Sequence, residues 1–234
     1  MDTRRPRASH DTQPRARGRH ALKSRRFAAE LVESAGISGS DLVIEVGAGS
    51  GKITEELAAR ARMVLAIELD SALATRLIAR FETRDNVVVA AGDALAVPLP
   101  AEPFRVFGNI PFAITTNLLR RLLDDPNASM QRADLIVQVG AAIKRTRVQP
   151  SRMLNLSWGP WWEFRIARRI PSTCFEPRPS VEAALLTISK RKIPLLPTRD
   201  RAAFASFLKQ GFSKDTHAGD KDLDRWLDLF RTSK

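Results

Sequence analysis

The sequence predicts an α/β protein in which a doubly wound sheet is followed by a small helical region. Apolar segments of strand length alternate with amphipathic segments of helix length, as in such sheets. The strand Leu42–Val46 stops in closely spaced glycines before a helix, which lets a cofactor approach bare backbone above the helix N-terminus. Residues 193–198 hold two prolines and lead to two short helices with too little apolar surface to fold alone.

Composition narrows the classes of partner. The 234 residues allow one large domain and a small appendage. The net charge of +12 favours a polyanion, since each neutralised phosphate releases counterions. Nucleic acid is favoured over a membrane surface, because no basic helix with a large apolar face stands out.

Other counts bear on compartment and cofactor. The single cysteine, Cys174, excludes an intramolecular disulfide and suits a reducing cytoplasm. No apolar run approaches the length of a membrane span. The three histidines are scattered, so we expect no metal site. We also expect a monomer.

Residues 1–19 predict a basic, disordered tail. They carry six arginines and almost no apolar side chain, so they cannot bury enough surface to order themselves. Two interpretations remain: a solvated tail without a role, or an arm that binds RNA through residues such as Arg15 and Arg17.

Residues 20–192 predict the main domain. A helical pattern begins at His20 and ends at Gly36, with Phe27, Leu31 and Val32 on one face. The following elements are a helix at 52–62, a strand at 63–67, a helix from about 71 to 81, strands at 87–90 and 104–107, a helix at 115–123, and strands at 133–139, 164–166 and 184–188. Residues 175–181 read as a proline-stiffened loop, and residues 198–234 as a small helical C-terminal domain.

Residues 144–169 form a basic region with interleaved tryptophans. Arginine and lysine side chains would bind phosphates there, and tryptophans could stack on bases. The candidates for phosphate binding are Lys144, Arg145, Arg147 and Arg152, and those for stacking are Trp158, Trp161 and Trp162. The alternative is packing on the sheet, which we favour for Trp162.

The glycine motif indicates which cofactor binds. A dinucleotide fingerprint needs glycine where this chain has Lys52. The observed E-x-G-x-G-x-G, from Glu45 to Gly51, resembles the first motif of S-adenosylmethionine (SAM)-dependent methyltransferases. Glu45 could accept hydrogen bonds from a ligand or from loop amides. Glu68 follows the next strand, where a carboxylate can bind both ribose hydroxyls. An ordinary glycine-rich turn is the alternative.

The second informative motif is Asn109-Ile110-Pro111-Phe112, at the end of the fourth strand of the sheet. Methylation of an exocyclic amine requires its delocalised lone pair to be pulled toward tetrahedral geometry. Asn109 Oδ1 and the Ile110 carbonyl could accept the two amine hydrogens, while Pro111 stiffens the loop. Phe112 could stack on the base. The alternative is an Asx turn before a proline.

Two further segments, Gly92-Asp93-Ala94 and Phe175-x-Pro-x-Pro-x-Val181, accompany these motifs. Taken together, they make the chain resemble the Erm-type 23S rRNA adenine-N6 methyltransferases of macrolide–lincosamide–streptogramin resistance. The resemblance implies a Rossmann-like SAM-binding domain, a small helical C-terminal domain and 23S rRNA as partner. It implies that Glu68 holds the ribose, Asp93 the adenine amine of SAM, and Asn109 and Phe112 the target adenine, with Phe175 against the opposite face. The cofactor-binding residues implied are His20, Leu22, Glu45, Gly47, Ala48, Gly49, Gly51, Glu68, Leu69, Asp93, Ala94 and Asn109.

The chain departs from this family near its N-terminus. Arg19-His20-Ala21-Leu22 stands where members usually carry a Gln-Asn-Phe-Leu-like stretch that closes over SAM, although His20 could still donate one hydrogen bond. Gln138-Val139-Gly140 replaces the usual charged continuation of the fifth strand, and the C-terminal domain is short. These changes could alter cofactor affinity or the number of methyl groups added.

Three other functions compete with this interpretation. A small-subunit rRNA dimethyladenosine transferase shares fold and chemistry, but Ile110-Pro111-Phe112 in place of Leu-Pro-Tyr and the short C-terminal domain favour the large-subunit enzyme. The intact loop at Asn109 argues against a catalytically idle RNA-binding factor. Lys52 and the basic charge disfavour a nicotinamide dehydrogenase. Mono- and dimethylation, and naked rRNA or a precursor particle, are all compatible with the sequence.

Overall fold

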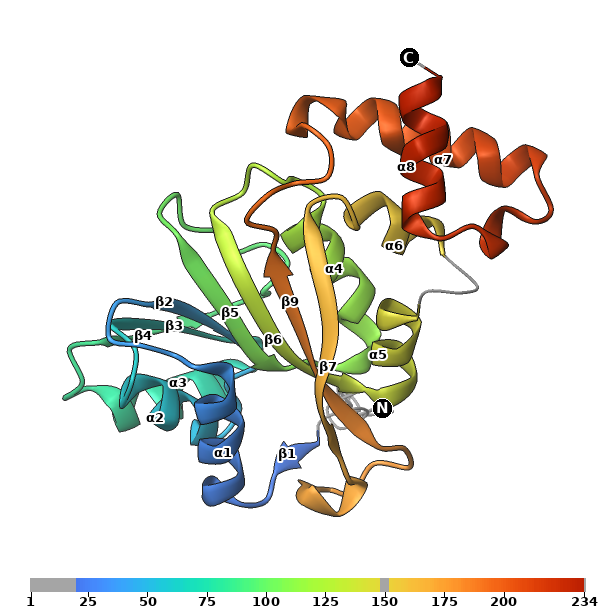
Figure 1. Ribbon diagram of the computed structural model, residues 1–234. Helices are drawn as coiled ribbons and strands as arrows, with labels where there is room; N and C mark the ends of the chain where they lie inside the picture. The colour runs from blue at the N-terminus through green and yellow to red at the C-terminus, as the bar shows by residue number, and fades with distance from the viewer. Residues whose placement is uncertain (1–19, 148–151, 234) are drawn as a thin grey trace, which may run out of the picture.

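The computed structural model describes residues 20–147 and 152–233, so the predicted tail, with Arg15 and Arg17, lies outside the described residues. A seven-stranded sheet in the order β4-β3-β2-β5-β6-β9-β7 forms the centre (Figure 1). Its parallel strands are β2 (Leu42–Val46), β3 (Met63–Glu68), β4 (Val87–Ala91), β5 (Phe104–Asn109) and β6 (Met130–Gln138). The strand β9 (Ala183–Lys190) runs antiparallel to both β6 and β7 (Trp162–Ile170). The predicted α/β class is confirmed.

Helices cover both faces of the sheet. Successive strand residues point to opposite faces, so Val43 packs in one apolar cluster while Ile44 packs in the other. The first cluster includes α1 (Arg25–Ala35), α2 (Lys52–Ala58) and α3 (Ser71–Phe81). The second includes α4 (Thr115–Leu123), α5 (Val139–Thr146) and α6 (Met153–Trp158). The carboxyl ends of the parallel strands remain open between these layers.

The N-terminal segment differs from the prediction. The helix α1 begins at Arg25, because the Ser24 hydroxyl caps it by accepting a hydrogen bond from the Phe27 amide at 3.3 Å. Before it, β1 (Ala21–Leu22) pairs antiparallel with β8 (Phe175–Glu176). The prediction that the helix begins at His20 is therefore wrong, since a partner strand from far along the chain holds this segment extended.

Several boundaries of helices and strands also differ from the predicted ones. The strand β6 ends at Gln138, and Val139 opens α5, a helix that the sequence did not predict; α6 was missed as well. The strand β7 extends well beyond the predicted residues 164–166, because it pairs with β9 along its length. Short 3₁₀ turns complete the fold at Phe112–Ile114, Ser172–Cys174, Thr198–Asp200 and Ala218–Asp220.

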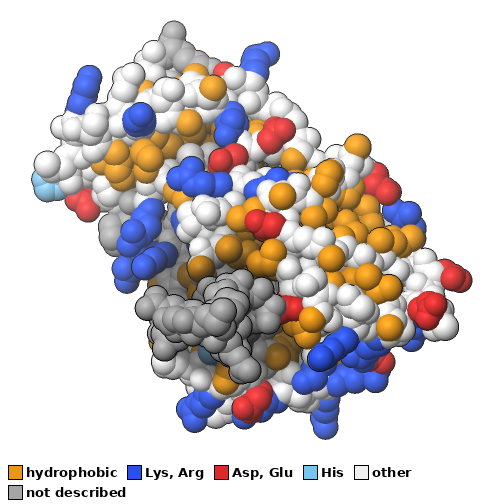
Figure 2. Space-filling view, turned by 180° about the vertical axis from the view of Figure 1, so that it is seen from behind, with side chains coloured by type: hydrophobic (Ala, Val, Ile, Leu, Met, Phe, Trp, Pro, Cys, Tyr) orange, Lys and Arg blue, Asp and Glu red, His pale blue; other side chains and the backbone are white. Residues whose placement is uncertain are grey.

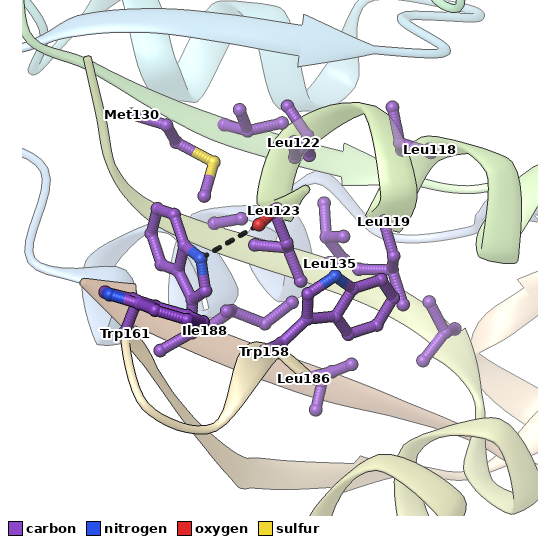
Figure 3. Close-up of a cluster of buried hydrophobic side chains, with 14 of the residues drawn as sticks. Leu118, Leu119, Leu122, Leu123, Met130, Leu135, Trp158, Trp161, Leu186 and Ile188 are labelled. Atoms are coloured by element: carbon purple, nitrogen blue, oxygen red, sulfur yellow. Dashed lines mark hydrogen bonds between the residues drawn. The ribbon is translucent and has the colours of Figure 1, made fainter. Parts of the chain in front are cut away.

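The tryptophans of the basic region are core residues. Trp158 and Trp161 are each only 2% exposed and lie among leucines of α4 and the sheet (Figure 3). The indole N–H of Trp158 donates to Asp124 Oδ1 at 2.8 Å, and that of Trp161 to the Leu196 carbonyl at 3.0 Å. Base stacking by these two side chains is therefore a wrong prediction. Trp162 packs on the sheet as expected and donates to the Leu123 carbonyl at 3.2 Å.

The helical C-terminal region consists of α7 (Arg201–Lys214) and α8 (Leu223–Thr232). Both helices share the apolar cluster of α4 and α6, so they pack on the rest of the protein, at the upper right of Figure 1. The packing is close: a Cβ on Gly211 would lie 2.2 Å from the Trp226 ring. No helix of the described residues has the length and apolar character needed to span a bilayer.

Candidate functional site

A cavity of about 380 Å³ opens at the carboxyl ends of β2, β3 and β5. This volume is in the range of small-molecule sites. Its lining includes fourteen residues that the sequence singled out, namely His20, Leu22, Gly47, Ala48, Gly49, Glu68, Leu69, Asp93, Ala94, Asn109, Ile110, Pro111, Phe112 and Phe175. The fold thus brings the expected cofactor residues and the expected catalytic loop to one cavity, from segments far apart in the sequence.

The glycine loop lets backbone form the cavity wall. Gly47 adopts a φ of +76°, a region that L side chains rarely occupy, and a Cβ there would lie 3.3 Å from the Asn109 carbonyl. The loop is held by Glu68, whose Oε2 accepts from the Gly49 amide at 2.8 Å while Oε1 accepts from the Asp70 amide at 2.9 Å. Each oxygen keeps a further lone pair, so this carboxylate can also accept from a ligand.

Two predicted cofactor residues do not line the cavity. Gly51 caps α2 with a φ of +79°, and a Cβ there would lie 2.8 Å from Leu77, so it serves packing against α3. The side chain of Glu45 is completely buried, and neither carboxylate oxygen has a hydrogen-bond partner among the described residues. Direct ligand contact by these two residues is not supported by the geometry.

Burial sets the ionisation of Glu45. The loss of solvent raises the pKa of this carboxyl to about 7, and the nearby charge of Glu68 raises it further, while Thr54 offsets part of the rise. The buried Thr54 hydroxyl also has no hydrogen-bond partner among the described residues. The Glu45 carboxyl is therefore a buried group that holds its proton more tightly than an exposed glutamic acid does.

The catalytic loop is oriented by its neighbours. The Asn109 side-chain amide donates through Nδ2 to the His20 carbonyl at 2.6 Å, which commits the nitrogen and leaves Oδ1 as an acceptor. The Ile110 amide donates to the Ile136 carbonyl at 3.0 Å, continuing the pairing of β5 with β6. The loop that starts at Pro111 then turns into the 3₁₀ segment Phe112–Ile114. Asn109 and Ile110 both line the cavity, as the glycine loop does.

Aromatic and strap residues close the cavity. His20 Nδ1 lies 2.8 Å from the Pro177 carbonyl, which can only accept, so this nitrogen carries the proton. The imidazole packs against Phe112 with ring centroids 6.1 Å apart. Phe175, paired through β8 with Leu22, is buried at 2% exposure but reaches the cavity lining.

Sequence reasoning missed one polar wall residue, Lys52. Its ammonium donates to the carbonyls of Leu22 and Lys23 at 2.7 and 3.0 Å. A signal was present: a lysine at the first position of a helix opposes the helix dipole, which favours acidic residues there. In the sequence alone, Lys52 served only to exclude a dinucleotide site.

The basic candidates gather around a second cavity of about 490 Å³, away from the first. Five arginines and one glutamate contribute to its lining: Arg145, Arg147, Arg152, Arg165, Arg191 and Glu163. Burial, followed by the charges of Arg152 and Arg120, lowers the pKa of the Arg145 guanidinium. Arg145 donates to Asn155 Oδ1 at 2.9 Å and lies 5.5 Å from the Trp158 ring centroid. Lys144 is exposed on α5 beside this cavity.

Comparisons with known proteins agree with this geometry. Residues 13–225 match the family model of ribosomal RNA adenine dimethylases. The rRNA adenine N-6-methyltransferase of Bacillus licheniformis is 33% identical over 191 residues, 82% of this chain and 67% of that protein. The mycinamicin-resistance protein MyrB of Micromonospora griseorubida is 34% identical, over 94% of this chain and 74% of its own.

A solved structure supports the same conclusion. The crystal structure of the 23S rRNA methyltransferase ErmE matches with a TM-score of 0.74 and 28% identity, covering 85% of this chain and 82% of that one. The resemblance read from the two motifs is confirmed. The chain belongs to the ribosomal RNA adenine dimethylase family.

Proposed function

We propose that this protein methylates N6 of an adenine in 23S rRNA, with SAM as methyl donor, and that it thereby confers macrolide-type resistance. One observation carries the proposal: the Asn109–Phe112 loop and the glycine loop form walls of the same cavity. MyrB is named for mycinamicin resistance, which favours the resistance role, and ErmE is named for 23S rRNA, which favours the large-subunit substrate.

The residues of the cavity fit SAM. Glu68 would accept from the ribose hydroxyls with its remaining lone pairs, and Asp93, whose Oδ1 already accepts from the Leu95 amide at 2.8 Å, would accept from the adenine amine with its other oxygen. Gly47 and Gly49 leave room for close approach to backbone.

When bound, SAM supplies an electrophilic methyl group on a sulfonium. Asn109 Oδ1 and the Ile110 carbonyl accept the two hydrogens of the target amine and aim its lone pair at that methyl carbon. The same acceptors would stabilise the positive charge that develops on the nitrogen during methyl transfer. The proton leaves to solvent, so no side chain of unusual basicity is needed. Phe112 stacks on the extruded adenine, and Phe175 contacts its opposite side.

The arginine-lined cavity and its surroundings form the surface that binds RNA phosphates. Lys and Arg side chains gather below the helical C-terminal region, on the side where α5 and α6 lie (Figure 2). The helix α5 follows β6 directly, and its eight residues span about 12 Å, so the arginine-lined cavity lies about one helix length from the catalytic edge. Phosphates that flank the extruded adenine would bind Arg145, Arg147 and Arg152 there.

The test is nucleoside analysis of 23S and 16S rRNA after incubation with the purified full chain and SAM. We expect N6-methylated adenine in 23S rRNA, and primer extension would locate it. Asn109→Ala should reduce kcat by about 10²–10³, the loss typical of one preorganised polar contact, with little change in cofactor affinity. Methylation of 16S rRNA instead would favour the small-subunit alternative, and near-normal turnover by a folded Asn109→Ala variant would refute the assigned role.

A further inference from the structure

The most unusual part of the cavity is the segment of residues 20–23, here called the N-terminal strap. It is extended, and it is tied to three separate loops of the site. Lys52, the first residue of α2 after the glycine loop, donates to its Leu22 and Lys23 carbonyls. Asn109 of the catalytic loop donates to its His20 carbonyl. Through His20 Nδ1 and the β1–β8 pairing, the strap is also joined to residues 175–177.

Lys52 is an electrostatically unfavourable residue at its position in the helix. It is the first residue of α2, where the partial positive charge of the helix N-terminus repels an ammonium group. Its side chain is only half-buried and reaches two backbone carbonyls rather than a carboxylate. Residues that oppose local preferences are expected at functional sites, where another gain compensates.

We propose that Lys52 is a positioning residue that holds the N-terminal strap closed over the cofactor cavity and, through the His20 carbonyl, orients the Asn109 amide. The inference rests on the proposed function for the identity of the ligand beneath the strap. Because the strap is hydrogen-bonded both to Lys52, directly after the glycine loop, and to Asn109, cofactor binding and orientation of the target amine are coupled through it.

The geometry confines the effect of Lys52 to the strap. Immediately after the strap, α1 is fixed independently, since Arg25 pairs with Glu55 and with Glu56, each at 2.9 Å. Glu56 is held in turn by Arg60 at 2.9 Å. Removal of the Lys52 ammonium therefore leaves α1 and α2 joined. It leaves the strap carbonyls of Leu22 and Lys23 without the donor that draws them toward the cavity.

The test compares Lys52→Met with Lys52→Arg, which can still donate to two carbonyls. Lys209→Met, an exposed lysine on α7, controls for the loss of one positive charge. Hydrogen exchange reports the strap directly through the Lys23 amide, which donates to the Cys174 carbonyl at 2.9 Å. Calorimetry with S-adenosylhomocysteine reports cofactor affinity, and single-turnover methylation of 23S rRNA at saturating SAM reports the orientation of Asn109.

We expect Lys52→Met to speed amide hydrogen exchange at residues 21–23 and to leave exchange in β2 unchanged. It should also weaken the binding of S-adenosylhomocysteine about ten- to hundredfold, as expected for a lost hydrogen bond from a charged group. Its saturated rate should also fall, and Lys52→Arg should restore all three properties. Exchange and affinity equal to those of Lys209→Met would overturn the proposal. If wild-type protein binds no S-adenosylhomocysteine, the proposed function fails, while the exchange data still decide whether Lys52 holds the strap.

Discussion

The buried carboxyl of Glu45 predicts a specific dependence of stability on pH. Its pKa is raised to about 7 in the folded protein from an ordinary 4.5, chiefly by burial. Between these two values the folded protein holds a proton that the unfolded chain has lost. The contribution of Glu45 to the free energy of unfolding is therefore most favourable below about pH 4.5, and this contribution is lost as the pH rises to about 7.

The size of the effect follows from the shift. A displacement from 4.5 to about 7 corresponds to about 3 kcal/mol of unfolding free energy, at 1.36 kcal/mol per pKa unit. Glu45→Gln keeps the shape of the side chain but cannot ionise, so it removes this dependence. Other groups titrate equally in both proteins, and their contributions cancel when the two are subtracted.

The assay is denaturant unfolding of both proteins from about pH 4.5 to about pH 8. We expect the stability of wild-type protein to fall relative to Glu45→Gln by about 3 kcal/mol across this range, with most of the fall below about pH 7. The variant's own cost from a buried amide shifts the curve without changing its slope. Parallel curves would show that Glu45 titrates normally, and the buried-carboxyl reasoning would be wrong.

Three further predictions concern the site and the packing. Glu68→Ala should weaken the binding of S-adenosylhomocysteine by about 1.5–3 kcal/mol, the range for hydrogen bonds to a charged group. An unchanged calorimetric Kd would show that Glu68 does not bind the cofactor. Phe112→Ala should raise the KM for rRNA by a factor that corresponds to about 1–3 kcal/mol, the free energy of a lost base stack, whereas Phe112→Tyr should retain much of the activity. Kinetics of Phe112→Ala equal to those of the wild-type protein would contradict stacking. Gly211→Ala should lower stability by about 1–3 kcal/mol, because its Cβ would meet Trp226 at 2.2 Å; an unchanged Tm would show that the helices part freely.

The strands and the two motifs could be predicted because their signals are local. Leu42–Val46 is apolar at four of its five positions and is followed directly by Gly47, and such a segment is compatible with few environments other than a buried parallel strand. Asn109 is the last residue of the strand β5, and parallel strands bring their carboxyl ends to one edge. The sequence by itself therefore determined the fold class, the position of the site and most of its lining.

Tertiary structure alone decided the features that depend on distant partners. Pairing with Phe175–Glu176 makes Ala21–Leu22 a strand, which no local pattern indicates. The sequence favoured packing only for Trp162 and left base stacking open for Trp158 and Trp161, whereas the structure buries all three in the core. Glu45 and Gly51 belong to the cofactor motif by spacing, but their side of the loop faces the core rather than the cavity. Lys52 acquires its role only when the strap is folded beside it, because its acceptors are carbonyls thirty residues away. Spacing along the chain fixes which residues can be near, and packing fixes which way they point.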